Sequence, residues 1–235
     1  MPTQTFFNLP EAKRQALLDA AIDEFADNSY NHASISRIVA RLGIAKGSIY
    51  QYFQDKQDLY LYLLDLVIQE KLALLHGVQS PDPQMNIFAF LRRLLRSSAD
   101  FNFTRPRLAQ VAYRAIYDDL PFHDETIARM RAASATYITQ LVQQGISQGN
   151  IAPEVDPELA VFVISTLSAD FGKFIFARLG IDPRTLDGEN PLRQHLPEIE
   201  QLFDQLVTIL EQGLGNRQAG ATPGRESQGA TDDTR

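Results

Sequence analysis

The helical spacing of apolar residues is the feature that most constrains this chain. Apolar side chains recur every three or four residues, and no stretch shows the alternating, β-branched pattern that predicts a strand. The sequence therefore predicts an all-α fold. Beyond the first sixty residues, the expected helices are Gln84–Phe101, Arg107–Tyr117, His123–Gln148, Pro157–Leu179 and Gln194–Leu214, with a loop at Asp182–Pro191.

Helix start and stop signals organise the first part of the chain. Asn8, followed by proline and glutamate, predicts the start of the first helix. Ser34 can cap a short second helix that ends at Gly43, where glycine readily adopts the left-handed conformation. A third short helix is expected at Ala45–Phe53, and Asp55 is expected to cap a longer helix that reaches about His76.

The composition excludes several classes of protein. Of 235 residues, 44% are hydrophobic and none is cysteine, which excludes wholesale disorder, disulfides, thiolate catalysis and cysteine zinc sites. No secretory signal is visible, and no apolar run reaches the roughly 18 residues of a membrane helix. We therefore expect a soluble cytoplasmic protein without membrane contact.

The charge distribution allows a nucleic-acid partner despite a net charge of −7. Between Ser29 and Lys56, four basic residues stand against the single acidic residue Asp55. Because phosphate contacts are local, such a small basic face can bind DNA on an acidic protein.

Two short helices separated by a glycine turn are typical of a DNA-binding helix-turn-helix. The second helix, AKGSIYQYF, presents polar and aromatic residues around an inward Ile49 and Phe53. Gly47 weakens this helix and indicates a close approach to its backbone, for which a phosphate is the simplest candidate.

The segment Leu17–Tyr60, and above all LGIAKGSIYQYFQDK, resembles the tetracycline-repressor (TetR) family of bacterial regulators. The resemblance implies an N-terminal three-helix DNA-binding domain and a variable C-terminal helical domain for effector binding and dimerisation. We place the first domain at residues 1–55, the second at 56–215 and a disordered tail at 216–235.

The resemblance also implies which residues contact DNA. They are Ser34, Ser36, Arg37, Lys46, Gly47, Ser48, Tyr50, Gln51, Tyr52 and Lys56. Lys56, at a helix N-terminus, would complete a phosphate site. The sequence departs from the family pattern at Ser29, Val39, Ala45 and Gln51. Ala45 lacks a phosphate-binding or capping hydroxyl, whereas Gln51 can read adenine through two hydrogen bonds.

The last two helices are candidates for a dimer interface. The segment LAVFVISTLSADFGKFIF is apolar nearly all round, and the final helix carries one apolar stripe. Together they can form half of a four-helix interface, although an intramolecular core would show the same pattern. The residues predicted at the interface are Phe162, Phe174, Ile199, Leu202, Phe203, Leu206, Ile209 and Leu210.

Aromatic residues in the middle of the chain are candidates for an effector pocket, with ordinary core packing as the alternative for each. The candidates are Phe88, Phe101, Phe103, Tyr113, Tyr117, Tyr137 and Asp170, and Arg105, Arg107 or Arg114 would hold a polar end. The segment Asp118–Glu125 contains metal-ligand residue types, but an internal proline favours a solvated loop, so no metal is expected.

These observations predict a ligand-responsive transcriptional repressor without a cofactor. It would bind a palindromic operator as a homodimer and be released by a largely apolar small molecule. The alternatives are an all-α enzyme that uses the aromatic cavity, for which no catalytic spacing is visible, and an architectural DNA-binding dimer without effector.

Overall fold

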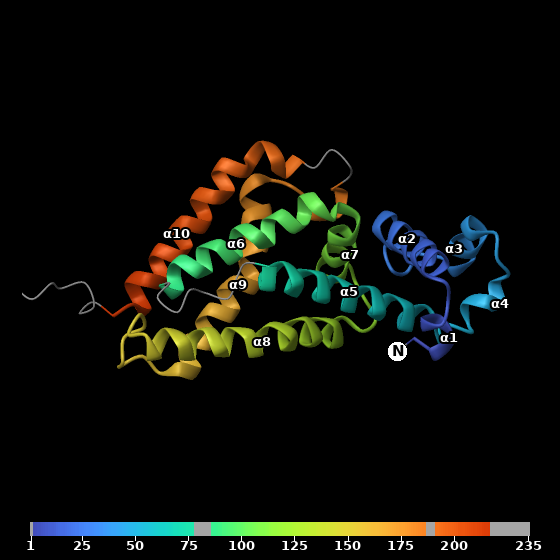
Figure 1. Cartoon of the computed structure of the whole chain (residues 1–235). Coiled ribbons are helices and arrows are strands. Elements are labelled where there is room, and N and C mark those ends of the chain that lie inside the picture. Colours follow the sequence, from blue (N-terminus) through green and yellow to red (C-terminus); the bar gives the residue numbers. More distant parts are fainter. Residues whose placement is uncertain (1, 78–85, 187–190, 217–235) are drawn as a thin grey trace, which may run out of the picture.

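The computed structural model describes residues 2–77, 86–186 and 191–216, and its regular structure in these ranges is helical apart from one isolated bridge between Ile151 and Gly215 (Figure 1). The all-α prediction is therefore confirmed. The α-helices are α1 (Gln4–Phe7), α2 (Glu11–Asp27), α3 (Ile35–Leu42), α4 (Lys46–Ile49), α5 (Lys56–Gly77), α6 (Ile87–Thr104), α7 (Pro106–Tyr117), α8 (His123–Ser147), α9 (Pro157–Leu179) and α10 (Leu196–Leu214). Short 3-10 turns lie at Pro183–Thr185 and Pro191–His195.

The N-terminal helices α1 to α4 form one end of an elongated molecule (Figure 1). The expected helix start at Asn8 is wrong, because Asn8 ends α1 and α2 begins three residues later without a side-chain cap. Phe6 of α1 is fully buried against Phe53 and Tyr62, at ring-centre distances of 5.0 and 5.4 Å. The backbone of Thr3 also donates to the Tyr52 carbonyl at 2.8 Å. Aromatic packing thus orders a segment whose sequence carries no helix-start signal.

The turn between α3 and α4 follows the sequence prediction. Gly43 has φ of 65° and ends α3, as expected of a glycine in the left-handed region. Ser34 precedes α3 but makes no side-chain cap; its backbone N–H instead donates to the Glu24 carboxylate at 2.8 Å. Helix α4 is shorter than predicted, because the residues after Ile49 form a turn.

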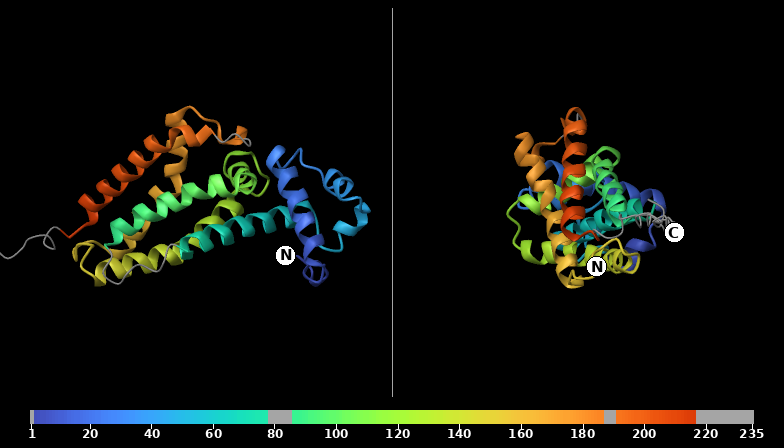
Figure 2. Two further views of the ribbon diagram at one scale, coloured as in Figure 1. Left: turned by 45° about the horizontal axis from the view of Figure 1, so that its top comes forward. Right: turned by 90° about the vertical axis from the view of Figure 1, so that its left-hand side faces the viewer.

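Helix α5 connects the two ends of the molecule (Figure 2). The predicted cap is confirmed, since the Asp55 carboxylate accepts from the Asp58 N–H at 2.8 Å. The first turns of α5 bury Leu59 and Leu63 in the same core as α2, α3 and α4. That core continues into Val111 and Ala115 of α7, so α7 packs directly on the N-terminal helices. The proposed boundary between residues 55 and 56 therefore cuts a shared core.

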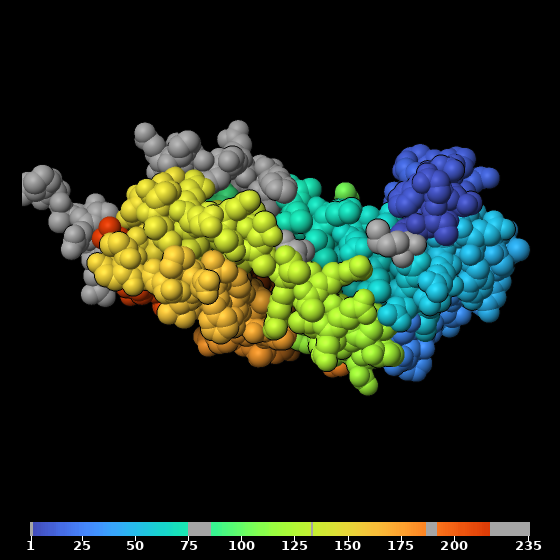
Figure 3. Space-filling view, turned by 90° about the horizontal axis from the view of Figure 1, so that it is seen from below, coloured from blue at the N-terminus to red at the C-terminus, as the bar shows by residue number. Residues whose placement is uncertain are grey.

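The C-terminal helices surround a second core. Helix α10 packs along α6, and α8 packs along α9. Helices α8 and α9 form the yellow-green to orange part of the face in Figure 3. The bounds of α9 match the prediction, whereas α6 begins at Ile87, after its capping residue Asn86. The predicted loop at 182–191 contains a 3-10 turn, and residues 187–190 lie outside the described part. The predicted tail also lies outside it from residue 217 onward.

Four of the residues predicted at the dimer interface belong to the interior of the protomer instead. Ile199, Phe203, Leu206 and Leu210 are buried against α6 and α9, because the apolar stripe of α10 faces its own chain. Leu202 is partly buried. The intramolecular alternative is therefore correct for this stripe.

The remaining predicted interface residues are exposed. Phe162 and Ile209 are each 64% exposed, and Phe174 is 50% exposed. Helix α9 also contains an 18-residue window of mean hydropathy 1.6 of which only 22% is buried, so by length and composition alone it could cross a membrane. Figure 2 shows α9 and α10 side by side, so one face of the protomer carries an unusual amount of exposed apolar surface.

Candidate functional site

Helix α4 and the turn after it form a protruding surface at the N-terminal end (Figure 1). Lys46, Gly47 and Gln51 are exposed, and Tyr50 is 50% exposed. Nothing lies within 4 Å of a Cβ built at Gly47, so its backbone is open to an approaching group. Ser36 is exposed near the start of α3. The fold thus presents the polar residues of the predicted reading helix outward.

Other predicted DNA-contact residues are only partly exposed. Ser48 and Tyr52 are half-buried, and Tyr52 packs against Phe6 at a ring-centre distance of 6.5 Å. Ser34 is also half-buried. The absence of a side-chain cap at Ala45 agrees with the missing hydroxyl noted in the sequence.

Three of the four basic residues in this segment form hydrogen bonds or ion pairs with other parts of the chain, although Arg37 and Arg41 are exposed. Arg37 forms an ion pair with Glu24, with Nη2 to Oε1 at 2.5 Å, and Arg41 pairs with Asp23 at 3.1 Å. Lys56 Nζ donates to the carbonyls of Tyr30 and Ala33 at 2.7 and 3.2 Å.

Lys56 is therefore placed differently from the expected phosphate ligand. Its ammonium lies 4.3 Å from the centre of the Tyr30 ring, and burial lowers its pKa. The two carbonyls belong to the turn before α3, so the side chain fastens this turn to α5. Arg37 likewise fastens α3 to α2. These intramolecular bonds position the helix-turn-helix.

Lys46 is thus the basic residue of this segment best placed to meet a phosphate. Lys46→Met is expected to weaken binding to all DNA sequences about equally. The slope of log affinity against log salt concentration should become smaller by about 1 per protomer. Lys56→Met should instead lower the free energy of unfolding by about 1–3 kcal/mol, because two hydrogen bonds are lost. The salt dependence of DNA binding should stay unchanged. Binding titrations at several salt concentrations and urea unfolding measure both. A lower slope for Lys56→Met would place Lys56 on the DNA.

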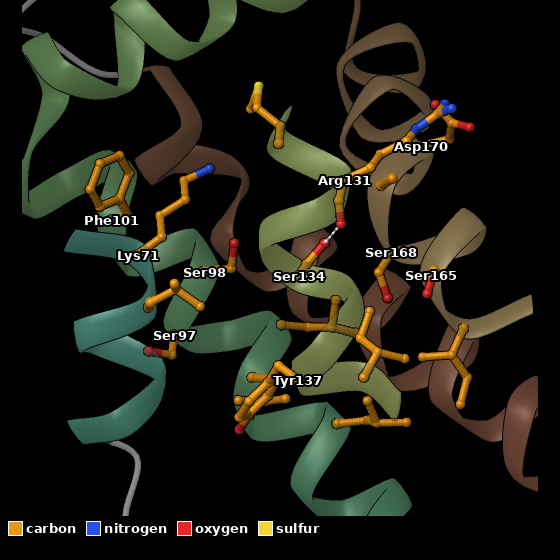
Figure 4. A pocket seen from close by; sticks show the side chains of 18 of the residues that line it. Lys71, Ser97, Ser98, Phe101, Arg131, Ser134, Tyr137, Ser165, Ser168 and Asp170 are labelled. Carbon is orange, nitrogen blue, oxygen red and sulfur yellow. Dashed lines mark hydrogen bonds between the residues drawn. The ribbon is translucent and has the colours of Figure 1, made fainter. Parts of the chain in front are cut away.

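A cavity of about 340 Å³ lies within the C-terminal helices. Helices α5, α6, α8, α9 and α10 supply most of its wall, and Ile116 of α7, a helix that packs on α2, also lines it. Figure 4 shows polar side chains reaching into it from α5 and α6 on one side and from α9 on the other, with α8 between them. Ligand sites commonly occupy cavities of about 300–1,000 Å³ with mostly apolar walls, so this cavity is the candidate effector site.

Three of the seven predicted pocket residues line this cavity: Phe101, Tyr137 and Asp170. The other four lie elsewhere and pack in the core, which was the alternative prediction for each aromatic residue. Phe88 is buried beneath α10, while Phe103, Tyr113 and Tyr117 pack with Phe176 and its neighbours. Asp170 lies at the edge of the cavity and pairs with Lys173 at 3.0 Å.

The arginines expected at the polar end have other partners. Arg105 pairs with Glu70 at 2.6 Å, and Arg107 and Arg114 bind α2. Lys71, Arg131, Ser134, Ser165 and Ser168 line the cavity in their place and were not predicted. Their sequence signal is a polar residue on the inward face of a helix, which resembles an ordinary surface residue until the helices are packed.

Helix α7 connects the cavity with the N-terminal helices. Its Ile116 lines the cavity, while Arg107 pairs with Asp23 at 3.0 Å and Asp27 at 2.7 Å. Arg114 Nε donates to the Ala26 carbonyl at 2.7 Å. These bonds hold the C-terminal end of α2. A shift of α7 at the cavity would therefore move α2 and the helices packed on it.

The segment with metal-ligand residue types uses them for other contacts. Asp118 forms an ion pair with Arg114 at 3.3 Å, and the His123 ring contacts the Ile116 carbonyl at 3.3 Å. Within the described ranges, no group of three or more histidine and carboxylate side chains is arranged to hold a metal ion.

Two family models match the chain over most of its length. Residues 17–63 match "Bacterial regulatory proteins, tetR family", and residues 85–215 match "Tetracyclin repressor-like, C-terminal domain". A TetR family transcriptional regulator from Chloroflexus aurantiacus is 45% identical in sequence; the match covers 92% of this chain and 100% of that one, with a TM-score of 0.68.

More distant relatives share the fold. FadR from Bacillus subtilis, solved in complex with stearoyl-CoA, is 19% identical over 85% of this chain and 98% of its own, with a TM-score of 0.62. The Escherichia coli regulator RutR is 22% identical over 193 residues, or 82% of this chain and 89% of RutR.

Proposed function

Because the chain belongs to the TetR family of bacterial transcriptional regulators, we propose that it represses transcription from a palindromic operator until a small molecule enters the cavity. Members of this family are DNA-binding, ligand-responsive dimers and are not enzymes, so the enzyme alternative does not hold. A cytoplasmic location follows from a DNA partner and is part of the proposal.

The single observation that carries the proposal is the position of α7. This helix meets the cavity through Ile116 and holds α2 through Arg107 and Arg114. An effector releases DNA only if it binds one arrangement of the two DNA-binding domains more tightly than the other. A ligand that displaces α7 meets this condition, because the same helix sets the position of α2.

The exposed face of α9 and α10 supports the dimer. Phe162, Phe174 and Ile209 lie on this face, together with Leu159, which is 55% exposed. Single exposed apolar residues are common, but several large ones on two adjacent helices favour an interface. We place the twofold axis of the dimer on this face, so that α9 and α10 of two protomers form a four-helix contact.

The effector is proposed to be largely apolar. Leucine, isoleucine and valine side chains make up much of the cavity wall. The relative FadR, solved with stearoyl-CoA, shows that this fold can accommodate an acyl compound. We therefore expect the ligand of this chain to carry an apolar chain or ring system.

Gln51 is the proposed base reader. It is exposed beside α4, and a glutamine amide can pair with both N6 and N7 of adenine. Gln51→Ala should flatten the base preference at one position of each half-site, a loss of about 1–3 kcal/mol of discrimination, with non-specific binding and its salt dependence nearly unchanged. Selection from a randomised duplex library with both proteins measures this. An unchanged base profile would assign Gln51 to the phosphate backbone.

The selected operator also permits a test of repression itself. A reporter that carries this operator should be expressed less when the protein is present, and a cell extract or ligand library should contain a compound that restores expression. Activation of the reporter would reverse the proposed direction. Repression that no compound relieves would favour an architectural role.

A further inference from the structure

The charges that line the cavity are predominantly positive. Its described wall contains Lys71, Arg131 and Lys173 against one carboxylate, Asp170, which already pairs with Lys173 at 3.0 Å. The wall thus has a positive excess in a protein whose overall charge is −7. An anionic group is the natural complement of such a surface.

Lys71 is the least exposed of these three cations, because Arg131 and Lys173 are both exposed. Its Nζ lies 5.2 Å from the centre of the Phe101 ring, and no carboxylate of the described residues pairs with it. The side chain lies along the cavity wall beside Phe101 in Figure 4. Burial lowers the pKa of this amine, because its surroundings solvate the charged form poorly. A carboxylate in the cavity would remove this penalty.

A second polar atom in the wall also lacks a partner. The Ser165 hydroxyl of α9 is buried and forms no hydrogen bond within the described part of the chain. Buried hydroxyls without partners are rare, since each costs free energy comparable to a lost hydrogen bond. Ser165 lines the same cavity as Lys71, so the wall holds more than one polar group that the protein itself leaves without a full partner.

The rest of the cavity wall is mostly apolar. Lys71 lies beside Phe101, which is near the end of α6 that leads into α7, and Ile116 of α7 lines the same cavity. The aliphatic part of the wall includes Leu91, Leu94, Ile138, Leu141, Ile164, Leu206, Val207 and Leu210. A ligand that fits this lining has a charged head and an apolar tail.

The volume favours a ligand of moderate size. The cavity of about 340 Å³ lies at the small end of the range of about 300–1,000 Å³ in which ligand sites commonly fall. A medium-chain acid is therefore the ligand class that we test.

We propose that the effector is a free medium-chain carboxylic acid, held with its carboxylate on Lys71 and its apolar tail among the leucines of α6, α8 and α10. The inference rests on the proposed function, since it specifies the ligand of the same cavity. Because Ile116 of α7 lines the same cavity, a ligand held there can influence the hold of α7 on α2.

Calorimetric titration of the full-length dimer with decanoate and with decanol tests the assignment. The two probes share the tail and differ in the charged head. Decanoate should bind at least tenfold more tightly than decanol, as expected for a charge-assisted hydrogen bond in a poorly solvated site. Equal affinities would overturn the role of the carboxylate.

Lys71→Met is the decisive variant. It keeps most of the length of the side chain and should reduce decanoate affinity at least tenfold. Decanol should bind as before, which also shows that the cavity is intact. Lys173→Met is the matched control, because it removes the same charge from the same wall but from an ammonium already paired with Asp170. Lys173→Met should reduce decanoate affinity by less than threefold. Unchanged decanoate binding by Lys71→Met would refute the proposed site.

Band shifts on the selected operator separate the two proposals. If decanoate binds through Lys71 but leaves the operator complex intact, the ligand assignment stands and the release mechanism fails. If another compound releases the protein from the operator while neither decanoate nor decanoyl-CoA binds, the proposed release mechanism stands. The assignment of a medium-chain acid as the ligand then fails. Binding of decanoyl-CoA in preference to decanoate would replace the free acid by its thioester and so overturn the assignment.

Discussion

Phe162→Glu is expected to convert the dimer into folded monomers and to lower operator affinity by two orders of magnitude or more. Phe162 is 64% exposed in the protomer, so the glutamate is solvated in the monomer and costs its fold little. In the dimer the same carboxylate would be buried without a partner, which is strongly unfavourable. Light scattering and circular dichroism measure the mass and helicity of the variant.

Leu206→Glu is the matched control for this experiment. Leu206 is only 8% exposed and packs inside the protomer, so its replacement should unfold the C-terminal helices as well as dissociate the dimer. Native helicity with loss of dimerisation is therefore expected for Phe162→Glu alone. A dimeric Phe162→Glu protein would place the interface elsewhere.

Glu24→Ala is expected to destabilise the N-terminal domain by about 1–3 kcal/mol. Glu24 is 3% exposed, and its carboxylate accepts from the Ser34 N–H and from the Arg37 guanidinium. The variant leaves the Ser34 N–H without its acceptor and α3 without its ionic link to α2. Urea unfolding followed by circular dichroism measures the loss of stability. Operator affinity should also fall, because the unfolded fraction of the protein does not bind DNA.

Two arginine variants test the interpretation of this ion pair. Arg37→Ala leaves the buried Glu24 carboxylate without its cation and should lower the urea midpoint clearly, whereas Arg41→Ala breaks an exposed pair and should lower it little. An unchanged midpoint for Arg37→Ala combined with weaker operator binding would return Arg37 to the DNA surface, as the sequence predicted.

The helix-turn-helix is the part of the molecule best predicted from the sequence. Its signals are local: Gly43 must take a positive φ, Asp55 caps α5, and Ile35, Ile38 and Val39 lie on one face of a short helix. Each of these depends on residues a few positions apart. Local chemistry therefore sufficed for the order of these helices, the end of α3 and the start of α5. It did not give the length of α4 or the start of α2. It also missed α1, whose position depends on Phe6 packing against Phe53 and Tyr62.

The tertiary structure alone decided the partner of each polar group and the direction of each apolar stripe. Helical periodicity predicts that Phe203 and Leu206 pack against an apolar surface. It does not distinguish a helix of the same protomer from a helix of a second protomer, and in the structure both residues pack inside the protomer. In the same way, Lys56 and Lys71 are both lysines on α5, yet one binds two carbonyls and the other borders a cavity. Contact depends on residues far apart in the chain, which the spacing of residues within one helix does not encode.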